Sequence, residues 1–182
     1  MSSITSSHDR TPEIRAFITR FIESDAGLGA SPKDLVIDAF GDGESARLAD
    51  DLLELVLAGT KTATCMSAWA WEKEFETPLT PGMLSVILDG SGHPRCVVET
   101  ISVQRMPYRE VTADFARAEG EHTQPDLDDD SVLDQWREAH WAFFAKTLPP
   151  IGRAPSQDMP VLCERFEVVY SETRHASFDA GM

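Results

Sequence analysis

Apolar residues recur at helical spacing in three segments of the chain. In residues 11–24 they fall at i, i+3, i+4 and i+7 behind Thr11 and a proline, which predicts a helix capped by the threonine. Residues 45–59 repeat this spacing with leucines and end in glycine, a common residue after a helix. Residues 131–148 repeat it with aromatic residues, and Ser131 is the expected start. We therefore expect three long helices.

Other apolar stretches are shorter, rich in β-branched residues and bounded by turn residues, which is typical of strands. They occupy residues 35–42, 83–92, 95–106 and 161–170. A glycine-rich turn with a proline separates the second from the third, which predicts a hairpin. A short helix is expected over residues 111–120, followed by an acidic loop that leads to the third long helix.

This order of elements lacks the regular alternation of strands and helices that parallel sheets show. It favours an α+β fold, in which helices flank a small, mostly antiparallel sheet or barrel. A length of 182 residues suits one domain. We expect the helical segment in residues 1–30 to pack on a domain formed by residues 31–170. The polar residues 171–182 are expected to form a flexible tail.

Acidic residues outnumber basic ones by 31 to 16, and the formal net charge is −15. A protein that binds long duplex DNA neutralises many phosphates with clustered lysine and arginine, and this chain has no such cluster. A pocket with one or two cations suits an uncharged nucleoside better than a long polymer of phosphates. We therefore expect a modified nucleoside or a short single-stranded RNA as the partner, with the oligomeric state left open.

Several features of the sequence favour a cytoplasmic protein without a membrane partner. The apolar runs are shorter than the roughly 20 residues that span a bilayer, and the N-terminus lacks the apolar segment of a signal peptide. Cys65, Cys96 and Cys163 are odd in number and show no CxxC spacing, as expected for reduced thiols. The acidic clusters match no calcium loop and no zinc pattern, so no resident metal is expected.

The segment GTKTAT, residues 59–64, carries the most specific candidate chemistry. In a flat strand Lys61 and Thr64 would face opposite sides, so their cooperation requires a bend between them. With such a bend, a lysine whose pKa is lowered by burial would take the proton of the threonine hydroxyl. A carboxylate, for which Glu119 and Glu121 are candidates, would carry that proton to the leaving group. The alternative for each of these residues is a solvated side chain.

Two further polar residues fall on apolar faces. His140 lies between Trp136 and Phe143 on the third long helix, which favours a buried core histidine, with a base or a substrate-stacking residue as the alternative. Glu164 shares a strand face with apolar residues and needs a partner there. We expect it to form a structural salt bridge, with Lys61 as one possible partner.

The order of these segments resembles the ASCH domain family, whose fold is similar to the PUA RNA-binding barrel. The resemblance spans roughly residues 36–170 and includes FGDGESARLADDLLELVLAGTKTAT, VILDGSG, WREAHWAFF and MPVLCERFEVVY. The hallmark of the family is a glycine, one residue, a lysine and then hydroxyl residues, which Gly59, Lys61, Thr62 and Thr64 match.

The resemblance implies a PUA-like, mostly antiparallel β-barrel flanked by helices, with a cleft beside the lysine motif that accepts RNA or a nucleoside. Small bacterial members of the family hydrolyse the amide of N4-acetylcytidine without a cofactor, using a lysine, a threonine and a glutamate. Those roles would fall on Lys61, Thr64 and Glu119. Where the family motif often ends in arginine, this chain has Cys65, which removes a cation that would anchor phosphate or carboxylate.

Two alternative functions follow from the same resemblance. One is a ribonuclease that cuts single-stranded RNA, assisted by a divalent metal at the acidic loop. The other is a non-catalytic RNA or nucleotide binding module, in which Trp69, Trp71 or Tyr108 would stack on a base. Thr62 and His140 complete the expected substrate-binding set.

Overall fold

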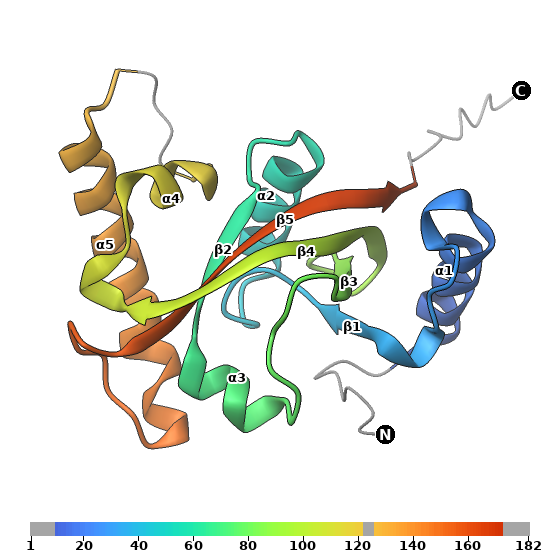
Figure 1. Ribbon diagram of the computed structural model, residues 1–182, viewed down its shortest axis with the longest axis horizontal. Helices are drawn as coiled ribbons and strands as arrows, with labels where there is room; N and C mark the ends of the chain where they lie inside the picture. The colour runs from blue at the N-terminus through green and yellow to red at the C-terminus, as the bar shows by residue number, and fades with distance from the viewer. Residues whose placement is uncertain (1–9, 122–125, 173–182) are drawn as a thin grey trace, which may run out of the picture.

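A computed structural model describes residues 10–121 and 126–172 and gives the chain one five-stranded sheet with helices around it (Figure 1). The strand order is β1-β3-β4-β5-β2. β1 and β3 run parallel, and all other neighbouring pairs are antiparallel. The strands are β1 (Leu35–Asp38), β2 (Ala63–Ser67), β3 (Leu84–Leu88), β4 (Pro94–Pro107) and β5 (Pro160–Ser171).

The α+β class and the mostly antiparallel sheet are confirmed, but the expectation of a closed barrel is wrong. In the described part of the chain, β1 pairs with β3 alone and β2 with β5 alone, so these two strands are the edges of an open sheet. The long strands β4 and β5 carry the sheet across the molecule, and their pairing shifts register at Val97/Val98 and Thr100/Ser102. Such bulges bend and twist a sheet, and here the bending stops short of closure.

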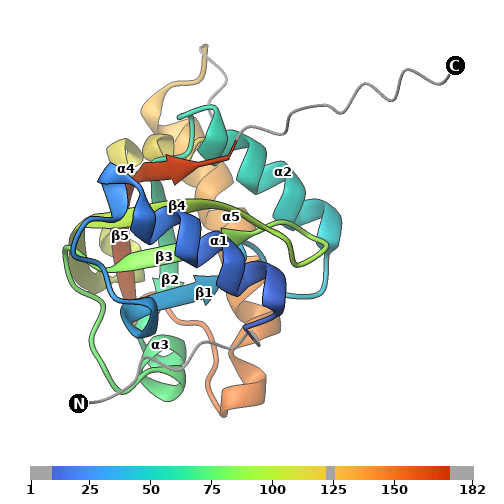
Figure 2. The ribbon, with the colours of Figure 1, turned by 90° about the vertical axis from the view of Figure 1, so that its right-hand side faces the viewer.

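Helices cover both ends of the long strand pair. In Figure 1, α4 and α5 lie at one end of β4 and β5, and α1 lies at the other; Figure 2 shows α1 crossing the sheet beside β1 and β3. The helices are α1 (Pro12–Glu23), α2 (Ala46–Leu57), α3 (Ala68–Glu74), α4 (Ala113–Ala118) and α5 (Asp129–Thr147). Single 3₁₀ turns occupy Asp25–Gly27, Pro32–Asp34, Tyr108–Glu110 and Pro149–Ile151.

The first predicted helix forms as expected. The Thr11 hydroxyl accepts a hydrogen bond from the backbone N–H of Ile14 at 3.2 Å, and the helix buries its apolar face against β1, β3 and β4. At the far end of the sheet, Arg20 of this helix forms two hydrogen bonds with the carboxylate of Glu172, at 2.6 and 2.9 Å. The chain just after β5 is therefore held against α1. The rest of the expected tail, residues 173–182, lies outside the described residues.

Two features of the helices differ from expectation. α5 begins at Asp129 and not at Ser131, because the Asp128 carboxylate accepts the backbone N–H of Ser131 at 2.8 Å and acts as the N-cap. Acidic residues in the first turn also suit the positive end of the helix dipole. The second difference is α3, which was not predicted. It follows β2 directly and is capped by Ser67.

The expected acidic loop covers residues 121–130, of which 122–125 lie outside the described residues and Asp129 and Asp130 begin α5. No helix within residues 10–121 and 126–172 has the length and apolarity that a membrane crossing requires.

Candidate functional site

Lys61 occupies a buried position between α2 and β2. The chain leaves α2 through Gly59, whose φ of 71° lies in the left-handed region that favours glycine, and reaches Lys61 two residues before β2 begins. The lysine is 2% exposed. Its ammonium donates to Glu121 Oε1 at 2.8 Å, to Glu119 Oε2 at 3.1 Å and to the carbonyl oxygen of Glu119 at 3.4 Å. All three ammonium hydrogens thus have an acceptor within reach.

These carboxylates decide the charge of the lysine. Burial alone would lower the pKa of Lys61, but the charges and hydrogen bonds of Glu119 and Glu121 outweigh burial, so its pKa lies above the usual value. The expectation of a lowered lysine pKa is therefore wrong. The side chain is a buried ammonium ion, which presents positive charge to its surroundings and is a poor proton acceptor at neutral pH.

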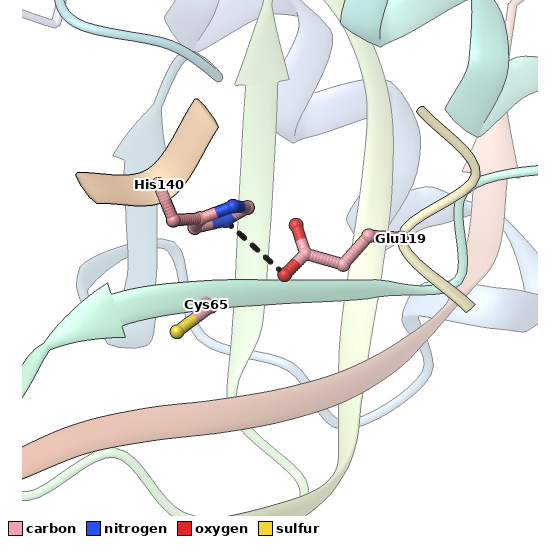
Figure 3. Close-up of side chains that lie close together, drawn as sticks. All are labelled: Cys65, Glu119 and His140. Atoms are coloured by element: carbon pink, nitrogen blue, oxygen red, sulfur yellow. Dashed lines mark ion pairs between the residues drawn. The ribbon is translucent and has the colours of Figure 1, made fainter. Parts of the chain in front are cut away.

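Glu119 is the centre of this cluster. It ends α4, and its Oε1 accepts a hydrogen bond from Trp136 Nε1 at 3.0 Å. The same oxygen lies 3.4 Å from His140 Nε2 (Figure 3). Burial would raise the pKa of Glu119, but the charges of Lys61 and His140 and the hydrogen bonds from His140 and Trp136 lower it to about 2. The carboxyl is therefore ionised across the physiological range.

Gly120 allows Glu119 to lie next to Lys61. Gly120 has φ of 76°, and a Cβ added there would lie 2.6 Å from the carbonyl oxygen of Thr60. The backbone N–H of Thr62 also donates to the carbonyl oxygen of Ala118 at 2.8 Å. The backbone at the end of α4 therefore contacts the backbone of the residues just before β2. Only a glycine at position 120 allows this approach, because it has no side chain.

His140 lies on α5 with its ring stacked on Trp136, at 4.0 Å between ring centroids and 19° between planes. Its Nδ1 is 3.0 Å from the carbonyl oxygen of Trp136, and because a carbonyl only accepts, Nδ1 carries a proton. Nε2 then faces Glu119. The expected burial of this histidine is confirmed, and the ring also reaches the cavity described below.

Cys65 brings a thiol close to the same cluster. Its Sγ, a Glu119 oxygen and a His140 nitrogen lie within 4.8 Å of one another, which is the one such group of possible metal ligands in the described part of the chain (Figure 3). A divalent cation at this group would have to displace the proton of the thiol and compete with a lysine for the carboxylate. Burial and the neighbouring Cys163 raise the pKa of the Cys65 thiol well above its usual value, and the Glu119 carboxylate already binds the Lys61 ammonium.

A cavity of about 370 Å³ opens beside this cluster, between the sheet and the helices α2, α3 and α5. This volume falls at the lower end of the range of roughly 300 to 1,000 Å³ that is usual for small-molecule sites. Its polar wall includes Lys61, Thr64, Glu119, Glu121, His140 and Glu164. Its aromatic wall consists of Phe40, Trp71, Phe75, Phe143 and Phe166.

The cavity brings together the three residues expected to be catalytic, Lys61, Thr64 and Glu119. The difficulty that Lys61 and Thr64 would face opposite sides of a strand does not arise, because β2 begins at Ala63 and the lysine precedes it. Strand alternation therefore fixes the direction of Thr64 but not that of Lys61.

Three of the expected substrate-binding residues lie outside the cavity lining. Thr62 is exposed, and its hydroxyl donates to the carbonyl oxygen of Ala118 at 3.3 Å. Trp69 lies under the guanidinium group of Arg153, at 4.7 Å from its ring centroid. Tyr108 is a core residue that stacks on Trp136, so the fold leaves its ring no room to stack on a base.

Glu164 forms a second buried carboxyl in the cavity wall. The expected salt bridge with Lys61 is absent among the described residues, and the carboxyl accepts a hydrogen bond from the Thr100 hydroxyl at 2.5 Å instead. Burial raises the pKa of Glu164, the hydrogen bond from Thr100 opposes this rise, and the negative charge of Asp38 adds to it, which leaves a pKa of about 7. The cavity thus holds two carboxyls with very different proton affinities.

The chain is similar to proteins of one family along most of its length. A family model described as ASCH domain matches residues 37–170. Protein EF3133 from Enterococcus faecalis V583, of the family DUF984, is 34% identical, with 90% of this chain and 96% of that chain covered and a TM-score of 0.73. An ASCH domain from Lactobacillus crispatus JV V101 is 29% identical, with 86% and 93% covered and a TM-score of 0.71. The comparison with curated proteins found no match.

Proposed function

Because this chain belongs to the ASCH domain family, which is generally RNA-related, we propose that its cavity binds a modified nucleoside and hydrolyses the amide of an N4-acylated cytidine. The observation that carries this proposal is the position of a buried ammonium, Lys61, and a hydroxyl, Thr64, in the wall of one cavity of nucleoside size. The aromatic side chains that line the same cavity suit a flat heterocycle.

In this reaction the Thr64 hydroxyl oxygen adds to the acyl carbon, and the bond between that carbon and N4 breaks. N4 of the leaving cytidine takes up the proton that Thr64 gives up, and water then cleaves the acyl–threonine ester. Lys61 supplies positive charge for the oxyanion that develops on the acyl oxygen, a contribution that is largest in a site shielded from water. Glu119 holds the lysine in its charged form.

Glu121 is the ligand of Lys61 that a substrate would displace. Its side chain is 24% exposed, whereas that of Glu119 is 2% exposed. Release of Glu121 frees one ammonium hydrogen for the acyl oxygen while the Glu119 pair stays intact. The low pKa of Glu119 argues against the proton-carrying role that the family resemblance implies for it.

A matched pair of variants tests this proposal. Thr64→Val and Thr62→Val make the same chemical change, but only Thr64 lines the cavity. With N4-acetylcytidine as substrate and chromatography for cytidine, wild type and Thr62→Val are expected to release cytidine at similar rates. Thr64→Val is expected to lose at least about a hundredfold, as is usual when a nucleophile is removed. Equal release by Thr64→Val would contradict the proposed role of this threonine.

Binding without turnover is a second candidate function. The observation that favours it is that every hydrogen of the Lys61 ammonium already has an acceptor. It predicts that N4-acetylcytidine binds to wild-type protein and is recovered intact. The ribonuclease alternative predicts instead that single-stranded RNA is cut by the purified protein.

A further inference from the structure

Glu164 stands apart from the cluster around Lys61, on a different strand of the cavity wall. It lies on β5 and is paired in register with Thr64 on β2 and with Val103 on β4. Residues paired across neighbouring strands point to the same face of a sheet, so the Glu164 carboxyl and the Thr64 hydroxyl are side by side at the cavity. Phe166, two residues further along β5, points to that face as well.

The surroundings of this carboxyl leave it without a cation. Asp38 of β1 is the charged group that acts on it, Thr100 of β4 donates to its Oε1, and no ion pair to Glu164 occurs within residues 10–121 and 126–172. The other titratable groups that line the same cavity are Lys61, Cys65, Glu74, Glu119, Glu121 and His140. Burial and the negative neighbour both favour the protonated form, so near neutral pH this carboxyl carries a proton much of the time.

A protonated carboxyl group can both donate and accept hydrogen bonds. One oxygen donates through its O–H, and the other accepts through its lone pairs. The Thr100 hydroxyl occupies part of the acceptor capacity of Oε1 and leaves the donor available. A heterocycle that lies against the aromatic wall and presents a ring nitrogen beside an N–H group would satisfy both functions of such a carboxyl at once.

We infer that Glu164 is the residue that recognises the nucleobase, by donating a hydrogen bond to N3 of cytosine and accepting one from the neighbouring N4–H. This inference rests on the proposed function for the identity of the ligand, but it requires binding only and no turnover. It makes binding depend on a proton, because an ionised Glu164 offers two acceptors and would face the lone pair of N3.

Titration calorimetry with cytidine, the product of the proposed reaction, tests this inference without catalysis. For a group with a pKa of about 7, the protonated fraction falls about tenfold between pH 6 and pH 8, and the affinity of wild type for cytidine is expected to fall by the same factor. Titrations at pH 8 in two buffers of different ionisation enthalpy are expected to report uptake of most of one proton per cytidine bound.

Two variants assign the proton to a residue. Glu164→Gln keeps an N–H donor, a carbonyl acceptor and the oxygen that Thr100 contacts, so it is expected to bind cytidine with equal affinity at both pH values and to take up no proton. His140→Asn removes the imidazole that lines the same cavity and keeps the carboxyl of Glu164, and it is expected to retain the pH dependence.

The results separate this inference from the proposed function. Wild-type binding that is independent of pH and takes up no proton overturns the inference, and so does a pH dependence that survives Glu164→Gln or disappears with His140→Asn. Proton-linked cytidine binding without release of cytidine from N4-acetylcytidine supports the inference and contradicts the proposed hydrolysis. Cytidine that binds at neither pH overturns the inference alone, because the proposed hydrolysis is measured by release of cytidine and does not require the product to bind.

Discussion

At the scale of single residues, the cavity places two buried carboxyls in different environments. Glu119 and Lys61 stabilise each other as a buried ion pair, while Glu164 has a negative neighbour and forms no ion pair within the described residues. Environments that push the proton affinities of two carboxyls apart are typical of sites that handle protons. The environments of Lys61, Glu119 and Glu164 therefore affect stability as well as function.

Loss of the lysine should destabilise the fold strongly. Lys61→Met leaves Glu119 buried without its counter-ion, and breaking a buried pair in this way costs about 3 to 5 kcal/mol of unfolding free energy. Glu121→Gln is the matched control, because its side chain is partly exposed and Lys61 keeps Glu119; its expected cost is about 1 kcal/mol or less. Urea unfolding at neutral pH measures both. Equal costs for the two variants would show that the Lys61–Glu119 pair is not the stabilising one.

The raised pKa of Glu164 predicts a pH-dependent stability of definite sign. Between the ordinary value of 4.5 and about 7, the folded state holds a proton that the unfolded state has lost, so stability falls as pH rises through this window and levels off above it. Glu164→Gln lacks this proton. The unfolding free energy of the variant relative to wild type should therefore rise by about 2 to 3 kcal/mol between pH 5 and pH 8. A difference that is the same at both pH values would mean that the carboxyl is ionised throughout.

At the scale of elements, the site depends on one contact between the end of α4 and the approach to β2. Gly120 makes that contact, because its backbone conformation and its distance from Thr60 both exclude a side chain. Glu119 reaches Lys61 only through this approach of the two backbones.

Gly120→Ala should therefore affect stability more than a change of the same kind elsewhere. Gly92, in the β3–β4 turn, has a similar φ of 82° but open space around it, so Gly92→Ala should cost only the left-handed backbone, about 1 to 2 kcal/mol. Gly120→Ala adds an overlap with the Thr60 carbonyl and should cost at least about 1 kcal/mol more. Thermal unfolding of the two variants compares them, and equal shifts in Tm would argue against a tight contact at Gly120.

Sequence reasoning predicted most elements because their signals are local. The apolar spacing and Thr11 cap of α1 and the β3–β4 hairpin are of this kind, and both formed as expected. The closed barrel and the salt bridge of Glu164 failed because they depend on which strands meet, and Thr100 became the partner through the β4–β5 pairing. The raised pKa of Lys61 was missed because it depends on two carboxylates nearly sixty residues away in the chain.

The candidate site could be predicted only in part from the sequence, for the same reason. Lys61 and Thr64 lie in one short motif, whereas the aromatic wall of the cavity includes Phe40 from the loop after β1, Phe143 from α5 and Phe166 from β5. Tyr108 was expected to stack on a base, but it packs on Trp136 in the core. The alternation of apolar residues along β5 did predict that Glu164 and Phe166 share a strand face, and both line the cavity.

At the scale of the whole molecule, the net charge of −15 predicts a different salt dependence of affinity for a nucleoside and for an RNA oligomer. An uncharged nucleoside feels little of this field, so its affinity should stay the same between about 50 and 300 mM NaCl. A short RNA oligomer is repelled, and added salt screens that repulsion, so its affinity should not fall as salt rises. Binding assays over this range compare the two ligands. A steep loss of RNA affinity with salt would reveal a basic phosphate-binding surface.

The claim that the cavity around Lys61 hydrolyses an N4-acylated cytidine can be tested directly. Wild type and Lys61→Ala are incubated with N4-acetylcytidine, and chromatography measures the cytidine released. Circular dichroism of the variant establishes that it is folded under the assay conditions. We predict release of cytidine by wild type and none by folded Lys61→Ala. No release by wild type, or normal release by Lys61→Ala, would contradict the claim.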